Sequence, residues 1–314
     1  FMPVDEWLQD AHAQSAVNPR FLSLYNGTSL TGEQGIPTAY QYDPQPGIDV
    51  PLQTISPAGA GFRLDFPEEA GNCATCHIPV AALDAPYSTD PNHAQGVEQE
   101  GIGCDFCHKI QDVRLQIDGG VYQGMPGILS IDLLRPPEGE QIFIGPFDDV
   151  VGDDIYSALQ NRSQICAACH SASFWDIPIY NSFGEWLASP YSDPEYGQTC
   201  QDCHMPHRGV TTFAQLPPDD TSYVPQRDPD TIFSHLMPGA SDVQLLQNTA
   251  ELTVDVQRDG NKLDVTVQVT NTGAGHHIPT DNPLRNMILL VTVTDAQGQS
   301  LDLLSGSTIP AWGG

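Results

Sequence analysis

The chain has 314 residues, 39% of them apolar, and its 40 acidic residues against 11 basic ones give a formal net charge of −29. This excess of negative charge repels nucleic acid and anionic lipid, so we expect neither as a partner. No apolar run reaches the roughly 18 residues that a membrane-spanning helix requires, so we expect no membrane span.

The first part of the chain is predicted to be a helix followed by a long loop. Residues 3–16 form an amphipathic pattern that Pro3 and Asp5 begin, and His12 lies on its apolar side. Residues 21–67 are rich in Gly, Pro, Tyr and Asn and show little periodicity. They are predicted to be an ordered loop that covers whatever the next segment binds.

The pattern Cys-x-x-Cys-His occurs four times between residues 73 and 204 and uses all eight cysteines. The cysteines are Cys73, Cys76, Cys104, Cys107, Cys166, Cys169, Cys200 and Cys203, and the histidines that follow them are His77, His108, His170 and His204. This is the attachment pattern of c-type haem. Two thiols one helical turn apart add to the porphyrin vinyl groups, and the adjacent histidine binds iron. The sequence therefore predicts four haem c cofactors.

Other uses of these cysteines fit less well. A lone Cys-x-x-Cys is also typical of a redox dithiol or of half a zinc site. Four copies, each followed by histidine and with no cysteine left over, argue against both. A disulfide framework does not explain why every second cysteine precedes a histidine.

The composition indicates a core that the chain does not build alone. Its apolar share lies below the roughly 45–50% usual for globular chains, while 27 prolines and 28 glycines favour loops. We expect haem to supply the missing core and the haem-free chain to fold poorly. Because haem is attached after export, and the sequence begins at Phe1 without a signal peptide, we interpret it as a processed periplasmic or extracellular form.

The spacing of the motifs suggests two local haem pairs. The first two motifs are 31 residues apart and the last two 34, with a long gap at residues 111–160. In that gap, a hairpin is predicted around Asp118-Gly119. A short helix is predicted at residues 181–189, between the third and fourth motifs.

After His204 the pattern changes to that of a small β domain. A helix is predicted at residues 242–249, with Ser241 and Gln244 as a capping box. Alternating residues on both sides of Asp259-Gly260 predict a hairpin, and further strands are predicted at 287–294 and 301–304. These strands are too few to close an immunoglobulin-like sandwich, so we expect the domain to be truncated or completed by another chain.

The predicted fold class is thus a mostly irregular and α-helical multihaem core, with haems as the core between short helices and long loops, followed by a small antiparallel β domain. We place the tetrahaem domain at residues 1–240 and the β domain at residues 241–314.

The remaining histidines are candidates for the second axial position on iron, which a low-spin electron-transfer haem fills with histidine or methionine. They are His12, His93, His207, His235, His276 and His277. We expect His12, His235 and at least one of His276 and His277 to serve, with His93 as a further candidate. His207 is too close to His204 to reach the opposite face of that haem. Ligation by Met125, Met205 or Met237 is the alternative, and it would raise the reduction potential.

Several segments together resemble a known family. They are WLQDAHA, CDFCHK, FGEWLASPYSDPE before CQDCHMP, FSHLMPGA and VTNTGAGHHIPTDNPLR, and they span residues 7–285. They are similar to tetrahaem c-type cytochromes, relatives of the nitrifiers' tetrahaem cytochrome and of extracellular cytochrome filaments, or nanowires. The resemblance implies that His12, His235 and His276 are distal ligands, with His277 and His93 as rivals for the fourth position.

The resemblance also implies how the molecule works. We expect an electron carrier with no catalytic residues, serving redox proteins or extracellular electron acceptors. In filament-forming members one distal histidine comes from the neighbouring subunit, and the helix of His12 or the β domain would suit such an exchange into a homo-polymer. The alternative is a haem enzyme of the nitrite or hydroxylamine oxidoreductase kind with one open iron. The Cys-x-x-Cys-Lys motif of nitrite reductases is absent, since Lys109 follows His108.

Overall fold

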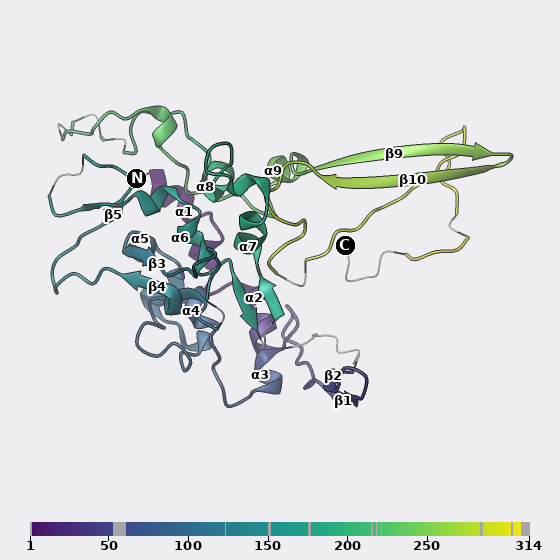
Figure 1. The fold of residues 1–314 in the computed structure, drawn as a ribbon, viewed down its shortest axis with the longest axis horizontal. Helices are drawn as coiled ribbons and strands as arrows, with labels where there is room; N and C mark the ends of the chain where they lie inside the picture. The colour runs from purple at the N-terminus through teal and green to yellow at the C-terminus, as the bar shows by residue number, and fades with distance from the viewer. Residues whose placement is uncertain are drawn as a thin grey trace.

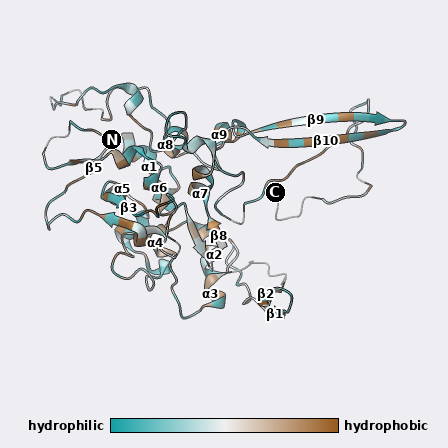
Figure 2. Cartoon of the chain, in the orientation of Figure 1, coloured by the Kyte–Doolittle hydropathy of each residue, from teal (hydrophilic) through white to brown (hydrophobic). Residues whose placement is uncertain are grey.

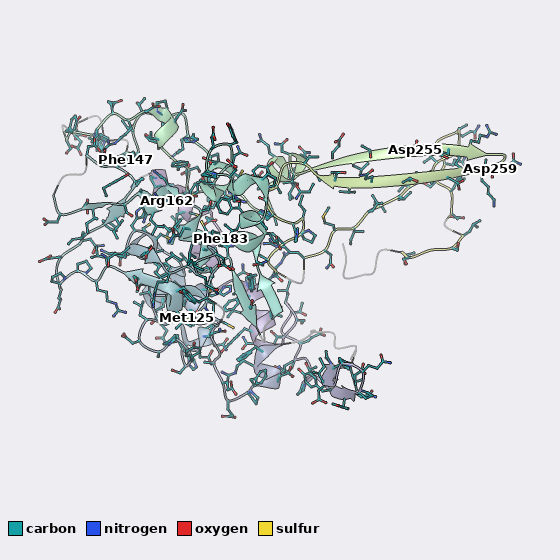
Figure 3. The ribbon with its side chains drawn as sticks, viewed as in Figure 1. Met125, Phe147, Arg162, Phe183, Asp255 and Asp259 are labelled. Carbon is teal, nitrogen blue, oxygen red and sulfur yellow. The ribbon has the colours of Figure 1, made fainter. Side chains whose placement is uncertain are left out.

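The computed structural model describes residues 2–52, 61–122, 124–149, 152–174, 177–214, 216–217, 219–220, 222–282, 285–302 and 304–308. Short helices and two-stranded sheets alternate with long loops in one body, from which the hairpin of β9 (Ala250–Asp259) and β10 (Lys262–Asn271) projects (Figure 1). Phe183 and Arg162 lie in the body, whereas Asp255 and Asp259 lie along the hairpin (Figure 3).

The N-terminal helix is shorter than predicted. α1 spans Met2–Trp7, and the chain then turns into the 3₁₀ helix η1 (His12–Gln14). Asp10 Oδ2 accepts hydrogen bonds from the backbone nitrogen and the ring Nδ1 of His12. Such side-chain bonds to the local backbone compete with a continuous helix, so the helix predicted over residues 3–16 breaks after Trp7.

The predicted loop over residues 21–67 contains regular structure. Helix α2 (Pro19–Asn26) is capped by Asn18 at its start and by Gly27, with a left-handed φ of 68°, at its end. Strands β1 (Tyr40–Asp43) and β2 (Ile48–Pro51) form a hairpin, and α3 (Phe62–Asp65) follows. Residues 53–60 lie outside the described part of the chain.

The four cysteine motifs each form about one helical turn. They contribute α4 (Ala74–His77), α5 (Cys104–Cys107), α6 (Gln164–Ala167) and α8 (Cys200–His204). Helices this short are unstable alone and depend on packing. The buried cluster that packs them consists of Ala74, Ala82, Phe106, Ile110, Val113, Val121, Ile128, Ile131, Leu159, Ala167, Ala168 and Phe183. Residues inside the first three motifs therefore form part of the core.

Small sheets and turns connect the motifs. β3 (Ile110–Val113) pairs antiparallel with β4 (Ile131–Leu133), β5 (Ile144–Gly145) parallel with β6 (Ile155–Tyr156), and β7 (Ala172–Phe174) antiparallel with β8 (Ile177–Tyr180). The hairpin predicted around Asp118-Gly119 is reduced to a single bridge between Leu115 and Val121. Helix α7 (Ser182–Leu187) lies where a helix was predicted. The remaining 3₁₀ helices are η2 (Pro91–His93), η3 (Gly96–Glu100), η4 (Gly127–Ser130), η5 (Ala158–Asn161), η6 (Pro190–Ser192) and η7 (Pro229–Thr231).

The C-terminal part is a helix and an isolated hairpin. Helix α9 (Val243–Gln247) is capped by Asp242, whose Oδ1 accepts from Leu245 N at 2.7 Å, and not by the predicted box of Ser241 and Gln244. The β9–β10 hairpin forms as predicted. The strand predicted at 287–294 does not form, because its backbone finds no partner beyond one bridge from Thr294 to Ser300. The segment predicted at 301–304 is also not a strand in its described residues, and residue 303 lies outside them.

The hairpin is amphipathic yet exposed on both faces. Alternation places its apolar side chains on one face and polar ones on the other, visible as alternating colours in Figure 2. The apolar face consists of Leu252, Val254, Val256, Leu263, Val265, Val267 and Val269. Most of these side chains are about half exposed, so the hairpin adds little to the core.

The surface is large for the size of the chain. It exposes 20434 Å², whereas a compact chain of this mass exposes roughly 13,000 Å². The protein alone therefore does not bury the area expected of 314 residues. Among the described residues, no helix is both long enough and apolar enough to cross a bilayer.

Candidate haem-binding centre

The cysteine motifs lie against one another in a different grouping from the predicted pairs. The Cys76 thiol of the first motif lies beside Cys169 of the third, and Cys166 of the third lies beside Cys200 of the fourth. The first motif therefore adjoins the third, although 90 residues separate Cys76 from Cys166 in the sequence.

Helix η5 connects the second motif to the fourth. Gln160 in this helix donates from Nε2 to the carbonyl of Cys107 at 3.2 Å. In turn, the buried Gln201 donates from Nε2 to the Gln160 carbonyl at 3.1 Å. The four motifs are thus parts of one centre.

Three motif histidines each face a second histidine from a distant segment. The ring centroids of His12 and His170 are 6.1 Å apart, those of His108 and His235 are 6.3 Å apart, and those of His204 and His276 are 6.1 Å apart. The three separations agree within 0.2 Å. The structure thus brings His12, His235 and His276 opposite three different motifs.

The spacing fits an iron held between two imidazoles. A metal–imidazole bond measures about 2.0–2.1 Å, and two such bonds in line, with half of each ring added, separate the centroids by about 6 Å. The observed centroid separations therefore match those of two imidazoles bound to one iron.

The four motif histidines are all oriented by a hydrogen bond at Nδ1. Nδ1 of His77 lies 3.4 Å from Ser15 O, that of His108 2.8 Å from Ile144 O, that of His170 2.9 Å from Asp281 Oδ2, and that of His204 2.7 Å from Pro238 O. Carbonyl and carboxylate oxygens only accept, so each Nδ1 carries the proton and each Nε2 keeps its lone pair. This is how proteins orient a metal-binding imidazole.

Two of the three facing histidines are also held at Nδ1, and the third is held through its backbone. Nδ1 of His12 lies 2.7 Å from Asp10 Oδ2, and Nδ1 of His276 lies 2.9 Å from His277 O. The backbone nitrogen of His235 donates to Glu6 Oε2 at 2.9 Å.

Burial favours the neutral form of three of these imidazoles, which is the form that binds a metal. It lowers the pKa of His77 to about 4 and is the main cause of the lowered pKa of His204 and His235. For His170, burial also lowers the pKa. The hydrogen bond and the charge of Asp281 act in the opposite direction and outweigh burial, so the pKa of His170 is raised overall. Burial, the largest single effect, raises the pKa of Asp281, but the hydrogen bond and charge of His170 and the two bonds from Ser182 together outweigh it and lower the pKa to about 2.

Three segments each contact two different motifs. Each segment supplies the histidine that faces one motif, and it also bonds to the motif histidine of another. Residues 12–15 place His12 against the third motif and Ser15 against the first. Residues 276–281 place His276 against the fourth motif and Asp281 against the third. Residues 235–238 place His235 against the second motif and Pro238 against the fourth. The motifs are thereby linked in the order one, three, four, two.

His77 is the exception. Its ring stacks on Phe21 with a centroid separation of 3.7 Å and an interplanar angle of 2°. A metal binds an imidazole in the plane of the ring at Nε2, so Phe21, which lies on the face of the ring, takes no part in such a bond. All ten histidines lie in the described residues, and no ring contact joins any of the other nine to His77.

Three histidines remain, of which His93 and His277 were predicted as candidate ligands and His207 was not. His93 is exposed in η2, and His207 packs against Phe233 at 4.5 Å. His277 is 80% exposed, and its Nδ1 lies 3.1 Å from Glu185 Oε1. The structure brings none of these three opposite a motif histidine.

Sequence reasoning missed the oxygens that orient the rings. Asp10 lies two residues before His12 and Asp281 lies within the HHIPTD run, so local signals existed for both. Their partners were not readable, because Asp281 bonds to His170 across 111 residues.

No protein-family model and no curated protein matches the chain. Its fold is similar to that of a penta-heme cytochrome c552 from Thermochromatium tepidum, with a TM-score of 0.60 and 20% sequence identity over 96% of this chain and 70% of that chain. The chain therefore shares the fold of a multihaem c-type cytochrome.

Proposed function

We propose that the protein carries single electrons through four haem c groups, one on each cysteine motif. Bound haem would supply a one-electron iron couple. The observation that carries this proposal is the set of three histidine pairs at 6.1–6.3 Å. Two histidines on one iron leave no open position for a substrate, which favours electron transfer over catalysis.

The residues support a continuous route in the order of motifs one, three, four and two. Adjacent thiols join the first motif to the third and the third to the fourth. The segment from His235 to Pro238 joins the fourth to the second. Neighbouring groups are therefore fixed by the same short stretches of chain.

The fourth distal ligand is proposed to come from a second copy of the chain, as in a conductive extracellular filament. His77 has no histidine opposite it, whereas His277 is exposed with its Nδ1 held by Glu185. That arrangement orients the ring of His277 through Nδ1 and leaves Nε2 available to bind a metal. His12, which the sequence suggested for exchange, instead faces His170 of its own chain.

An electron carrier of this kind would work outside the cytoplasm. Covalent haem attachment and the acidic surface fit an exported protein, periplasmic or extracellular, whose partners are redox proteins or extracellular acceptors. No nucleic acid or membrane surface fits a formal charge of −29.

The test begins with the assembled holoprotein. Mass spectrometry and a pyridine haemochrome assay should give four haems, and the oxidised spectrum should be low-spin without binding carbon monoxide. His277→Ala should make one haem high-spin and reduce the particle size in sedimentation, whereas His93→Ala, another exposed histidine, should change neither. Unchanged assembly and spin state in His277→Ala would refute the role of His277.

Since no second histidine faces His77, a second function is also favoured, an enzyme with one open iron of the nitrite or hydroxylamine oxidoreductase kind. It predicts that the assembled protein keeps one high-spin haem that binds carbon monoxide, and that it turns over nitrite or hydroxylamine. A fully low-spin assembly would exclude it.

A further inference from the structure

The third motif differs from the others in the chemistry around its two histidines. Nδ1 of His170 lies 2.9 Å from Asp281 Oδ2, and Nδ1 of the facing His12 lies 2.7 Å from Asp10 Oδ2. Both carboxylates are shielded, since the Asp10 side chain is 1% exposed and that of Asp281 12%. Both imidazoles of this pair therefore donate to anions.

In the other two pairs, the ring bonds of three of the four histidines go to neutral groups. Nδ1 of His108 bonds to Ile144 O, and those of His204 and His276 bond to backbone carbonyls. Glu6 approaches His235 through the backbone nitrogen and not the ring. In the described part of the chain, two ring–carboxylate bonds on one pair occur at the third motif alone.

The two aspartates are held firmly in place. Asp10 Oδ2 also accepts from the backbone nitrogen of His12 at 3.0 Å. Asp281 accepts from Ser182 N at 2.9 Å and from Ser182 Oγ at 3.0 Å, with a left-handed φ of 59°. Neither carboxylate is free to swing away from its imidazole.

Fixed negative charge favours the more positive state of a bound iron. A carboxylate bonded to Nδ1 makes the imidazole a stronger donor to the metal, and its charge acts strongly where water is excluded. Both effects stabilise ferric over ferrous iron and so lower the reduction potential.

We propose that Asp10 and Asp281 are positioning residues that make the haem of the third motif the lowest-potential haem of the chain. The inference rests on the proposed function, in which His12 and His170 share one iron. Since the third motif lies inside the order one, three, four, two, this haem would be an uphill step within the route.

The ring angles provide a way to follow this haem. The planes of His12 and His170 cross at 69°, whereas those of the second and fourth pairs cross at 27° and 16°. Steeply crossed imidazoles on low-spin ferric haem give a highly anisotropic EPR signal, and near-parallel ones give a rhombic signal. His12→Ala should remove the anisotropic signal and so assign it.

The experiment is an EPR-monitored redox titration of the assembled holoprotein. The anisotropic signal should be the last to disappear on reduction. Asp10→Asn and Asp281→Asn should each shift its midpoint upward, and the double variant further. Asparagine keeps an acceptor oxygen and tolerates a positive φ, so the change is mainly one of charge.

Asp112→Asn is the matched control, because this exposed carboxylate contacts Gln164 of α6 and no imidazole. It should leave the midpoint unchanged. The inference is overturned if the assigned signal disappears before another low-spin signal, or does not move in either aspartate variant. If a variant loses haem, the inference is tested by the unaltered protein alone, in which the anisotropic signal must be the last to disappear on reduction. Fewer than four haems, or no low-spin signals, would instead refute the proposed function.

Discussion

His235 shows how one side chain completes a site built by a distant motif. It faces His108 at 6.3 Å from a segment that also holds His204 through Pro238. We expect His235→Ala to open one iron, so that a single haem becomes high-spin and binds carbon monoxide. Optical titration with carbon monoxide measures this, with the exposed His207→Ala as the control. A fully low-spin variant would contradict the assignment.

Lys109 is a buried cation next to His108. It is 6% exposed, its Nζ donates to the Ile142 carbonyl, and it lies 4.9 Å from the centroid of the Phe143 ring. A cation beside an iron ligand disfavours the ferric state. We therefore expect Lys109→Met to lower the midpoint of the rhombic signal that His235→Ala removes. The exposed Lys262 on the hairpin provides the control Lys262→Met, which should leave it unchanged.

At this scale the sequence predicted residue types better than contacts. The Cys-x-x-Cys-His spacing predicts which four histidines bind iron, because covalent haem attachment requires that spacing. Which of the six other histidines faces a motif depends on tertiary structure. Only the structure places His12 opposite His170 and leaves His277 at the surface. The carboxylate on His170 was unreadable for the same reason.

Among the elements, η4 (Gly127–Ser130) joins the first motif to the third. Gly127, at φ 59°, donates to the Ala168 carbonyl at 2.7 Å, and a Cβ there would lie 2.1 Å from the Thr75 carbonyl oxygen. We expect Gly127→Ala to destabilise the holoprotein by the left-handed strain of roughly 1–2 kcal/mol and a further 1–3 kcal/mol from overpacking.

The control is Gly124→Ala, since Gly124 has a φ of 74° but no described atom within 4 Å of a Cβ. The Gly124→Ala variant therefore has the strain of a positive φ but no steric clash at Cβ. Thermal unfolding followed by circular dichroism compares the two variants. Equal melting temperatures would show that the contact between η4 and the first motif is unimportant.

Elements with strong local signals were predicted, and those shaped by long-range contacts were not. The β9–β10 hairpin and α7 follow from alternation and local pattern. The helix over residues 3–16 broke where Asp10 caps His12, and α2 formed inside a predicted loop because Asn18 and Gly27 cap it. The strand at 287–294 required a pairing partner that periodicity does not provide.

The charge of the whole molecule opposes its proposed assembly. Copies with a formal charge of −29 repel each other most strongly at low ionic strength. Salt shortens the screening length from roughly 30 Å at 0.01 M to about 8 Å at 0.15 M. We expect assembly to increase with sodium chloride over this range, measured by light scattering. The His277→Ala variant should remain small at both concentrations, and salt-independent size would argue against charge-limited association.

We expect the chain to depend on bound haem for a cooperative fold. The protein exposes 20434 Å² against roughly 13,000 Å² for a compact chain of its mass, and its core cluster includes residues inside the motifs themselves. Four porphyrins bound to the one-turn helices would cover much of this extra exposed surface. Protein produced without haem attachment should therefore lack a cooperative thermal transition and lose most helical circular dichroism. The matched comparison is the mature holoprotein under the same conditions. A sharp, reversible transition in the haem-free chain would mean that its side chains alone make a sufficient core.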